Sequence, residues 1–309
     1  GRVLIGAFAE VGERFQERTF ETQLREIWAA DDDRRVWLWG APGLGKSYVA
    51  RHVMQLALRD PSPERETLLI WADSATPQAV THAFARAAAR LGTPSAELSR
   101  GRIDVSDAVL ARELLNYLAT SENRWLVVLD NADAEALTAA NLIPTGTNSN
   151  GRVLITTPLS AGLSSTHGHL IQVDSFSDDE AEAFLQSQVP RSTTTDRVRL
   201  AQALGNHPLA LSIASSTIAA NRLTVDEWLD DLAAQQLDVA ADHPDTGGYP
   251  ALIGATWRIV LERASQGLSQ GELERAALVA AVSDPDRHPT WLWHRAAVAE
   301  WVAGDSSAP

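Results

Sequence analysis

The chain has 309 residues, enough for about two domains, and 45% of them are hydrophobic, as in an ordinary globular protein. Its formal net charge of −14, from 26 Lys and Arg against 40 Asp and Glu, disfavours general binding of nucleic-acid backbones or anionic membranes. The absence of cysteine excludes disulfides, thiolate-bound metals and a cysteine nucleophile, and with no signal peptide or membrane-spanning run it fits a cytoplasmic protein.

The first half of the chain alternates short apolar runs with longer helical patterns. The runs are partly β-branched, as buried parallel strands are. They lie at Val36–Trp39, Leu68–Trp71, Trp125–Leu129, Val153–Thr156 and, more weakly, Leu170–Val173. Helices are expected at Lys46–Arg59, Pro77–Leu91 and Asp104–Thr120. This alternation predicts an α/β fold, a parallel sheet with helices on both faces.

After Val173 the apolar strands stop and helical patterns continue. The sequences Ser177–Glu180 and Thr224–Glu227 are capping boxes that each open a predicted helix, toward Val189 and Gln236. A linker rich in Asp, Gly and Pro is expected at Ala240–Pro250. The other expected helices are Asp196–Leu204, Leu209–Ala220, Ala251–Ala264, Gly271–Val282 and Trp291–Val302.

A glycine-rich motif follows the first predicted strand and opens the first predicted helix. It matches the P-loop pattern of Gly, four residues, Gly, Lys and Ser or Thr. Gly43 and Gly45 would let backbone N–H groups wrap a polyphosphate, Lys46 would bridge the β- and γ-phosphates, and Ser47 would bind Mg²⁺. A surface turn could carry the same pattern, but the flanking strand and helix favour ATP or ADP with Mg²⁺. The candidate residues are Gly40, Ala41, Pro42, Gly43, Leu44, Gly45, Lys46, Ser47 and Tyr48.

The predicted strand Trp125–Leu129 is followed by Asp130, which is the Walker B form. Asp130 is expected to support Mg²⁺, although an Asp at such a position also commonly caps a helix. The predicted strand Leu68–Trp71 lies between the two motifs in the sequence. This indicates the class of P-loop proteins in which the Walker A and Walker B strands are not adjacent in the sheet. Lys46 and Asp130 are the candidate catalytic residues. Since Asn131 cannot accept a proton from water, hydrolysis is expected to be slow, or absent without a partner.

The order of these segments resembles the NB-ARC branch of the STAND NTPases, the signal-transduction ATPases with numerous domains. The likeness is greatest to bacterial members with tetratricopeptide repeats, and it covers nearly the whole chain. The segments that carry it are Arg14–Arg18, the P-loop, Arg124–Asp133, Arg152–Thr157, Val173–Ser177 and Leu204–Leu211. The last is similar to the family's Gly-Leu-Pro-Leu-Ala box, which implies that Pro208 packs on adenine. The family resemblance also implies that Phe15, Gln16 and Arg18 line the adenine pocket.

The resemblance implies a nucleotide-binding α/β domain over 1–175, a helical domain over 176–240 and part of a winged-helix domain over 250–309. It further implies a switch that is closed with ADP and that opens or oligomerises on exchange for ATP. Because the chain starts with Gly, we expect it to be a piece of a longer protein with sensor repeats and an effector domain. Two features depart from the family: Pro158 stands where an Arg often senses the γ-phosphate, and the Met-His-Asp box has no counterpart.

Two other functions stay open on the sequence alone. An AAA+-type motor or loader would need a catalytic acid beside Asp130, where Asn131 stands. The chain could instead be the nucleotide-binding module of a transcriptional regulator, although its acidic charge disfavours nucleic acid as a partner of this segment.

Overall fold

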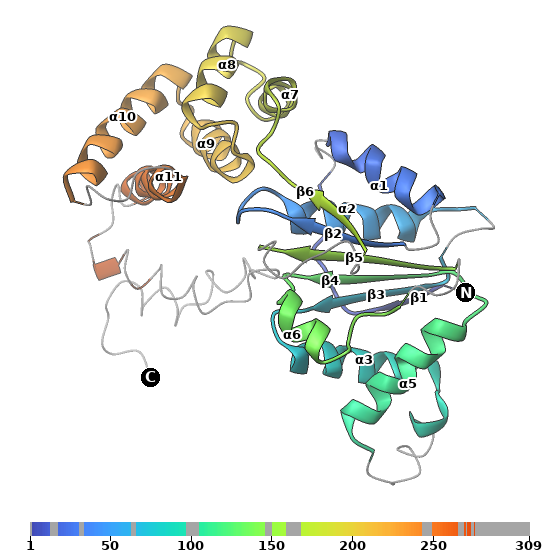
Figure 1. Ribbon diagram of the computed structural model, residues 1–309. Coiled ribbons are helices and arrows are strands. Elements are labelled where there is room, and N and C mark those ends of the chain that lie inside the picture. The colour runs from blue at the N-terminus through green and yellow to red at the C-terminus, as the bar shows by residue number, and fades with distance from the viewer. Residues whose placement is uncertain are drawn as a thin grey trace. The chain divides into compact units, whose positions relative to one another are not determined.

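The computed structural model describes residues 2–12, 18–30, 34–62, 66–96, 105–145, 150–158, 168–242 and 249–264, with a few positions between 269 and 275. The chain divides into two units, Gly1–Ser175 and Phe176–Pro309. The first unit carries the sheet and the P-loop, and the described part of the second unit is helical (Figure 1).

Six parallel strands form the sheet of the first unit, which confirms the predicted fold class. The strands are β1 (Val3–Ile5), β2 (Arg35–Trp39), β3 (Leu68–Asp73), β4 (Trp125–Asp130), β5 (Gly151–Thr157) and β6 (His169–Gln172). Their order across the sheet is β1-β3-β4-β5-β2-β6. The apolar pattern of the sequence predicts all of these strands except β1, whose Leu4 pairs with Leu69 of β3.

The strands that carry the two Walker motifs are not adjacent, as expected. The strand inserted between them is β5, which pairs with β4 on one side and with β2 on the other. The strand β3, which lies between the motifs in the sequence, pairs instead with the far side of β4. The carboxyl ends of β2 and β4 therefore reach the same edge of the sheet, one strand apart.

Helices cover both faces of the sheet, with α1 and α2 on one face and α3, α5 and α6 on the other (Figure 1). These helices are α1 (Thr19–Ala30), α2 (Lys46–Arg59), α3 (Pro77–Leu91), α5 (Asp107–Thr120) and α6 (Ala134–Ala139). Successive strand residues point to opposite faces, so Val127 packs in the core under α3 and α5, while Val128 packs in the core under α1 and α2.

Trp125 at the start of β4 shows how tightly the sheet packs against α5. Its side chain is fully buried, and its indole N–H donates to the carbonyl of Leu118 at 2.9 Å. A Cβ atom at Gly151, on the neighbouring strand, would lie 2.1 Å from the indole ring, so the ring occupies the space that a larger residue would need. Truncation of so well-packed an aromatic residue costs about 3–5 kcal/mol in other proteins.

The described part of the second unit is built from five helices. They are α7 (Asp178–Gln188), α8 (Thr194–Ala203), α9 (Pro208–Asn221), α10 (Val225–Asp242) and α11 (Tyr249–Ala264). Side chains cap the N-termini of α7 to α10. The capping box predicted at Ser177 is present, because its hydroxyl accepts from the Glu180 N–H at 3.1 Å and the Glu180 carboxylate accepts from the Ser177 N–H at 2.9 Å. The box at Thr224 and Glu227 is formed in the same way.

The predicted linker at Ala240–Pro250 is wrong at both ends, since α10 runs to Asp242 and α11 begins at Tyr249. Two residues of α11, Ala255 and Ile259, are buried in the same core as residues of α7 to α10. Nearly all of the rest of the predicted winged-helix segment lies outside the described residues, so the winged helix remains a prediction. No described helix has the length and apolar character needed to cross a membrane.

Candidate nucleotide-binding site

The P-loop joins the carboxyl end of β2 to the amino end of α2. Gly45 is the N-cap of α2 in the left-handed conformation, with φ of 93°, and as a glycine it makes no side-chain capping bond. No atom lies within 4 Å of the position that a Cβ at Gly45 would occupy, so the backbone conformation, and not crowding, calls for glycine. Backbone N–H groups at a helix start of this kind, with the positive end of the helix dipole, attract anions.

Gly40, at the start of the loop, is required for a different reason. A Cβ atom there would lie 2.3 Å from the backbone oxygen of Val173, much closer than two non-bonded atoms can approach. Val173 follows β6, and its N–H donates to the carbonyl of Trp39 at 2.8 Å. The loop therefore leaves the sheet through a gap between main chains that is too narrow for any side chain.

Lys46 brings a cation into the loop. The residue is 9% exposed, and its ammonium group donates to the carbonyls of Gly40 and Ala41, both at 2.8 Å. Burial lowers the pKa of Lys46, and the negative charge of the Asp130 carboxylate opposes this shift. Two residues predicted from separate motifs, Lys46 and Asp130, thus lie close enough to interact electrostatically.

Asp130 ends β4 and is held by the strands on both sides. Its carbonyl accepts from the N–H of Ser74 at 2.8 Å, and its carboxylate Oδ1 accepts from the hydroxyl of Thr156 at 2.6 Å. The N–H of Asn131 donates to the same hydroxyl at 2.8 Å, and Asn131 has a left-handed φ of 60°. Thr156 is not among the residues that the motifs predict. The feature that could point to it is its position at the carboxyl end of β5, the strand next to the Walker B strand β4.

The other residues of the loop differ in exposure. Leu44 is buried in the core under α1 and α2, Ser47 is half-buried on the first turn of α2, and Ala41 and Pro42 are exposed. Tyr48 is 44% exposed. Partial burial raises the pKa of its phenol, and a hydrogen bond from the Gly12 backbone lowers it by a smaller amount.

Arg18 is buried against the P-loop. Its guanidinium donates to the carbonyl of Leu44 at 3.2 Å, and to the carbonyls of Asp174 at 2.8 Å and Ser175 at 3.2 Å. These contacts join the loop to the segment after β6. Phe15 and Gln16 lie outside the described residues. Pro208 is the first residue of α9 in the second unit, so the adenine contacts expected of these residues remain predictions.

Asp133, the next acidic residue after Asp130, has a structural role. Its Oδ1 accepts from the Ala136 N–H at 3.0 Å and so caps α6. The acidic residue at the end of β4 whose charge acts on Lys46 is Asp130.

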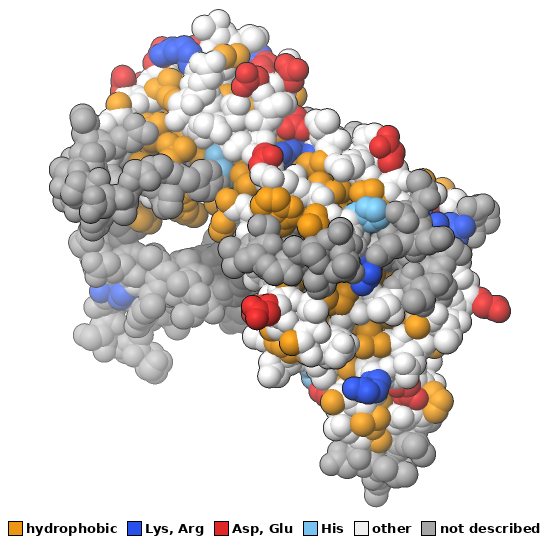
Figure 2. All heavy atoms as spheres, viewed as in Figure 1, with side chains coloured by type: hydrophobic (Ala, Val, Ile, Leu, Met, Phe, Trp, Pro, Cys, Tyr) orange, Lys and Arg blue, Asp and Glu red, His pale blue; other side chains and the backbone are white. Residues whose placement is uncertain are grey.

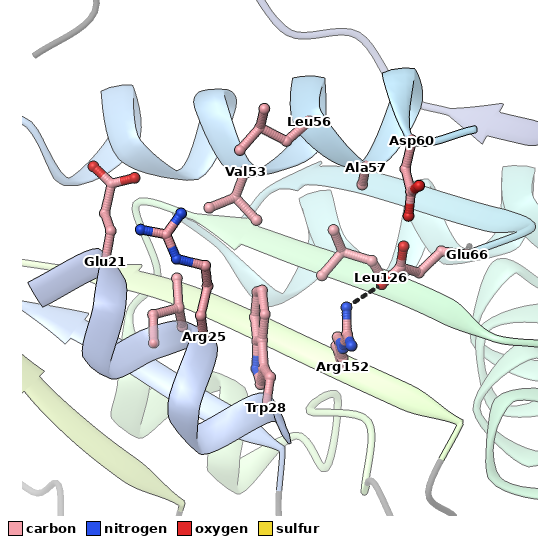
Figure 3. A pocket seen from close by; sticks show the side chains of 11 residues that line it. Glu21, Arg25, Trp28, Val53, Leu56, Ala57, Asp60, Glu66, Leu126 and Arg152 are labelled. Atoms are coloured by element: carbon pink, nitrogen blue, oxygen red, sulfur yellow. Dashed lines mark hydrogen bonds and ion pairs between the residues drawn. The ribbon is translucent and has the colours of Figure 1, made fainter. Parts of the chain in front are cut away.

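A separate cavity of about 250 Å³ opens between α1 and α2 (Figure 3). Arg152 and Glu66 lie at its base and form an ion pair of 2.6 Å, with the Arg152 guanidinium 5.4 Å from the ring centre of Trp28. Because Arg152 lies near the start of β5, this cavity is at the edge of the sheet opposite the P-loop. It contains none of the predicted site residues.

On the face shown in Figure 2, the described Lys and Arg side chains are scattered among acidic and uncharged ones.

The sequence matches the NB-ARC domain family over residues 16–195, and no curated protein sequence matches it. Among the solved structures that are similar to this chain, three are each 14% identical to it. A STAND protein with a tetratricopeptide repeat sensor from Pyrococcus horikoshii has a TM-score of 0.49, over 90% of this chain and 47% of its own. The Walker-type ATPase of Pyrococcus abyssi has a TM-score of 0.46, over 90% and 88%. Cdc6p from Pyrobaculum aerophilum has a TM-score of 0.46, over 70% and 68%.

The chain spans about half the length of the Pyrococcus horikoshii protein. The family match covers more than half of the chain and includes the P-loop, the strand that ends in Asp130 and all the strands of the sheet except β1. The chain therefore belongs to the NB-ARC family of P-loop nucleotide-binding proteins.

Proposed function

We propose that the chain is a signalling switch that binds ATP or ADP at the P-loop, closed with ADP and opened on exchange for ATP. The observation that carries the proposal is the form of the loop. Gly45 begins α2 in a left-handed conformation without a side-chain cap, and Lys46 places a buried ammonium group beside it. Backbone donors and a cation that converge at a helix start are what a polyphosphate chain requires.

Ser47 and Asp130 would hold Mg²⁺ together with phosphate oxygens. Within the described ranges, no group of three His, Asp or Glu side chains could bind a metal ion by itself. Mg²⁺ on a nucleotide needs few protein ligands, because the phosphates and water fill most of its octahedral shell. A hydroxyl and a carboxylate are hard oxygen donors of the kind that this ion prefers. The bound ion would neutralise phosphate charge.

The adenine base would contact Phe15, Gln16, Arg18 and Pro208, as the family resemblance implies. For Arg18 the geometry supports a further role, since its guanidinium bonds to the P-loop through the carbonyl of Leu44. A base bound there would meet a side chain that also holds the loop in place.

Hydrolysis by this switch would be slow or absent. The residue after Asp130 is Asn131, whose amide is not a general base. Its left-handed backbone conformation also suits Asp, so Asn131→Asp should fold normally. A rise in the turnover of ATP by this variant would show that the missing carboxylate limits hydrolysis, and unchanged turnover would refute that explanation.

As a switch, the protein would act with further domains of a longer chain and with copies of itself after ATP exchange. An AAA+-type motor would behave differently, with fast turnover in assembled rings that DNA stimulates. Measuring ATPase activity and mass in solution, with ATP and with and without DNA, separates the two functions.

The central test uses Lys46, which is the only lysine of the chain. ADP and ATP binding to the wild type and to Lys46→Ala would be measured by calorimetry with MgCl₂ present. Arg59→Ala is a matched control, because Arg59 is an exposed cation in the last turn of the same helix. We expect the affinity to fall in Lys46→Ala alone; equal affinity in all three proteins would remove the assignment.

Acetylation of amines gives a second readout of the same site. With one lysine in the chain, the side-chain amine can be followed by mass spectrometry without interference from other lysines. MgADP should slow acetylation of Lys46 while leaving the N-terminal amine unaffected. Equal rates with and without MgADP would contradict phosphate binding at Lys46.

A further inference from the structure

The hydroxyl of Thr156 makes two hydrogen bonds at the carboxyl end of β5. It accepts from the N–H of Asn131 at 2.8 Å and donates to Oδ1 of Asp130 at 2.6 Å. The direction of both bonds is set by chemistry, since a backbone N–H only donates and an ionised carboxylate only accepts. Thr156 is 1% exposed, so water does not compete strongly for either bond.

The backbone around this hydroxyl is fixed as well. The N–H of Ala132 donates to the carbonyl of Thr156 at 2.7 Å, and the N–H of Ser74 donates to the carbonyl of Asp130 at 2.8 Å. The turn after β4 is therefore bonded to β5 through both the side chain and the main chain of Thr156. A separation of 2.6 Å is typical of a hydroxyl bonded to an ionised carboxylate, which is one of the stronger hydrogen bonds in proteins.

We propose that Thr156 is a positioning residue for the divalent cation, acting through Asp130. This inference rests on the proposed function, in which Asp130 supports Mg²⁺ at the P-loop. One carboxylate oxygen is held by the Thr156 hydroxyl, which restricts rotation of the carboxylate before the ion binds. Mg²⁺ demands near-ideal octahedral geometry, so a preset carboxylate favours it.

A comparison of valine and serine at this position tests the role of the hydroxyl. Thr156→Val keeps the shape of the side chain but removes the donor to Asp130 and the acceptor for Asn131. Thr156→Ser keeps the hydroxyl and loses a methyl group. ADP affinity would be measured by calorimetry in EDTA and at increasing MgCl₂, for both variants and for the wild type.

We expect the valine variant to bind ADP in EDTA as the wild type does. Its half-maximal effect of MgCl₂ should require about ten- to a hundredfold more of the salt, the range known for the partners of metal ligands. The serine variant should restore most of the wild-type Mg²⁺ dependence. In an Asp130→Ala background, Thr156→Val should have no further effect, because the carboxylate through which it acts is gone.

Amide hydrogen exchange gives a readout that needs neither nucleotide nor metal. The Asn131 amide should exchange faster in Thr156→Val than in the wild type, since its acceptor is lost. If the valine variant shows no cooperative thermal unfolding, Thr156→Cys takes its place. Its thiol is a weak donor of similar size, so it should shift the Mg²⁺ requirement in the same direction.

The possible failures are distinguishable. Wild-type protein that binds neither ADP nor ATP would remove the proposed function and this inference with it. Wild-type binding that MgCl₂ does not strengthen would overturn this inference alone. So would a valine or cysteine variant with wild-type Mg²⁺ dependence.

Discussion

A histidine in the second unit should make the stability of that unit depend on pH. His207 is fully buried at the N-cap of α9, where its Nδ1 accepts from the N–H of Ala210 at 3.2 Å. Burial lowers its pKa from 6.5 to about 4. Between these values the unfolded chain binds a proton that the folded chain does not, so the free energy of unfolding falls as pH falls.

The size of the effect follows from the two pKa values. Each pH unit in that interval changes the free energy of unfolding by about 1.4 kcal/mol. Above about pH 6.5 His207 is neutral in both the folded and the unfolded chain and does not change the stability with pH. Between pH 6.5 and pH 4 the free energy of unfolding falls by about 3 kcal/mol. His207→Asn keeps a side-chain acceptor at the N-cap and removes the titration. The difference between wild type and variant should therefore change by about 3 kcal/mol over this range.

The assay is urea unfolding at several pH values from 7 to 4, followed by circular dichroism. Taking the difference between two proteins removes the contribution of carboxylates that titrate in both. A difference between wild type and His207→Asn that is the same at every pH would refute the reasoning.

Three further predictions concern the first unit. Gly40→Ala should lower stability by about 1–3 kcal/mol and weaken ADP binding, both measurable by unfolding and calorimetry, because its Cβ would overlap a backbone oxygen. Glu66→Gln should lower the free energy of unfolding by about 2 kcal/mol in urea titrations, less than for a fully buried ion pair because the Arg152 side chain is 30% exposed. Asp130→Asn should lower the pKa of Lys46 further and speed its acetylation at neutral pH; an unchanged rate would mean that the two groups do not interact.

Local patterns in the sequence predicted most of the fold. The P-loop and the apolar runs are contiguous, so their residue types reveal them without knowledge of distant partners. The strand β1 has only three residues and owes its stability to pairing with β3, which no local pattern shows. The helix α1 was also missed, although Leu24 and Trp28 lie four residues apart on its buried face.

The sequence motifs predict the main residues of the candidate site, but not the hydrogen bonds that hold these residues in place. Lys46 and Asp130 follow from the Walker patterns, whereas the bond from Thr156 to Asp130 depends on the insertion of β5 beside β4. Arg18 was expected near the nucleotide from family resemblance, but its bond to Leu44 could not be read from residue types. Such contacts join segments that are far apart in the chain, so they depend on the order of strands.

The strand order has a consequence for the synthesis of the protein on the ribosome. The strands β1, β3 and β4 can pair as soon as β4 has emerged, because each neighbours another in the sheet. The strand β2 pairs only with β5 and β6 among the described strands, so it must wait for residues that are translated much later. We therefore expect a nascent chain that stops after Asp130 to form only the β1-β3-β4 part of the sheet. In such a chain β2, which leads into the phosphate-binding loop, would not yet be paired with other strands.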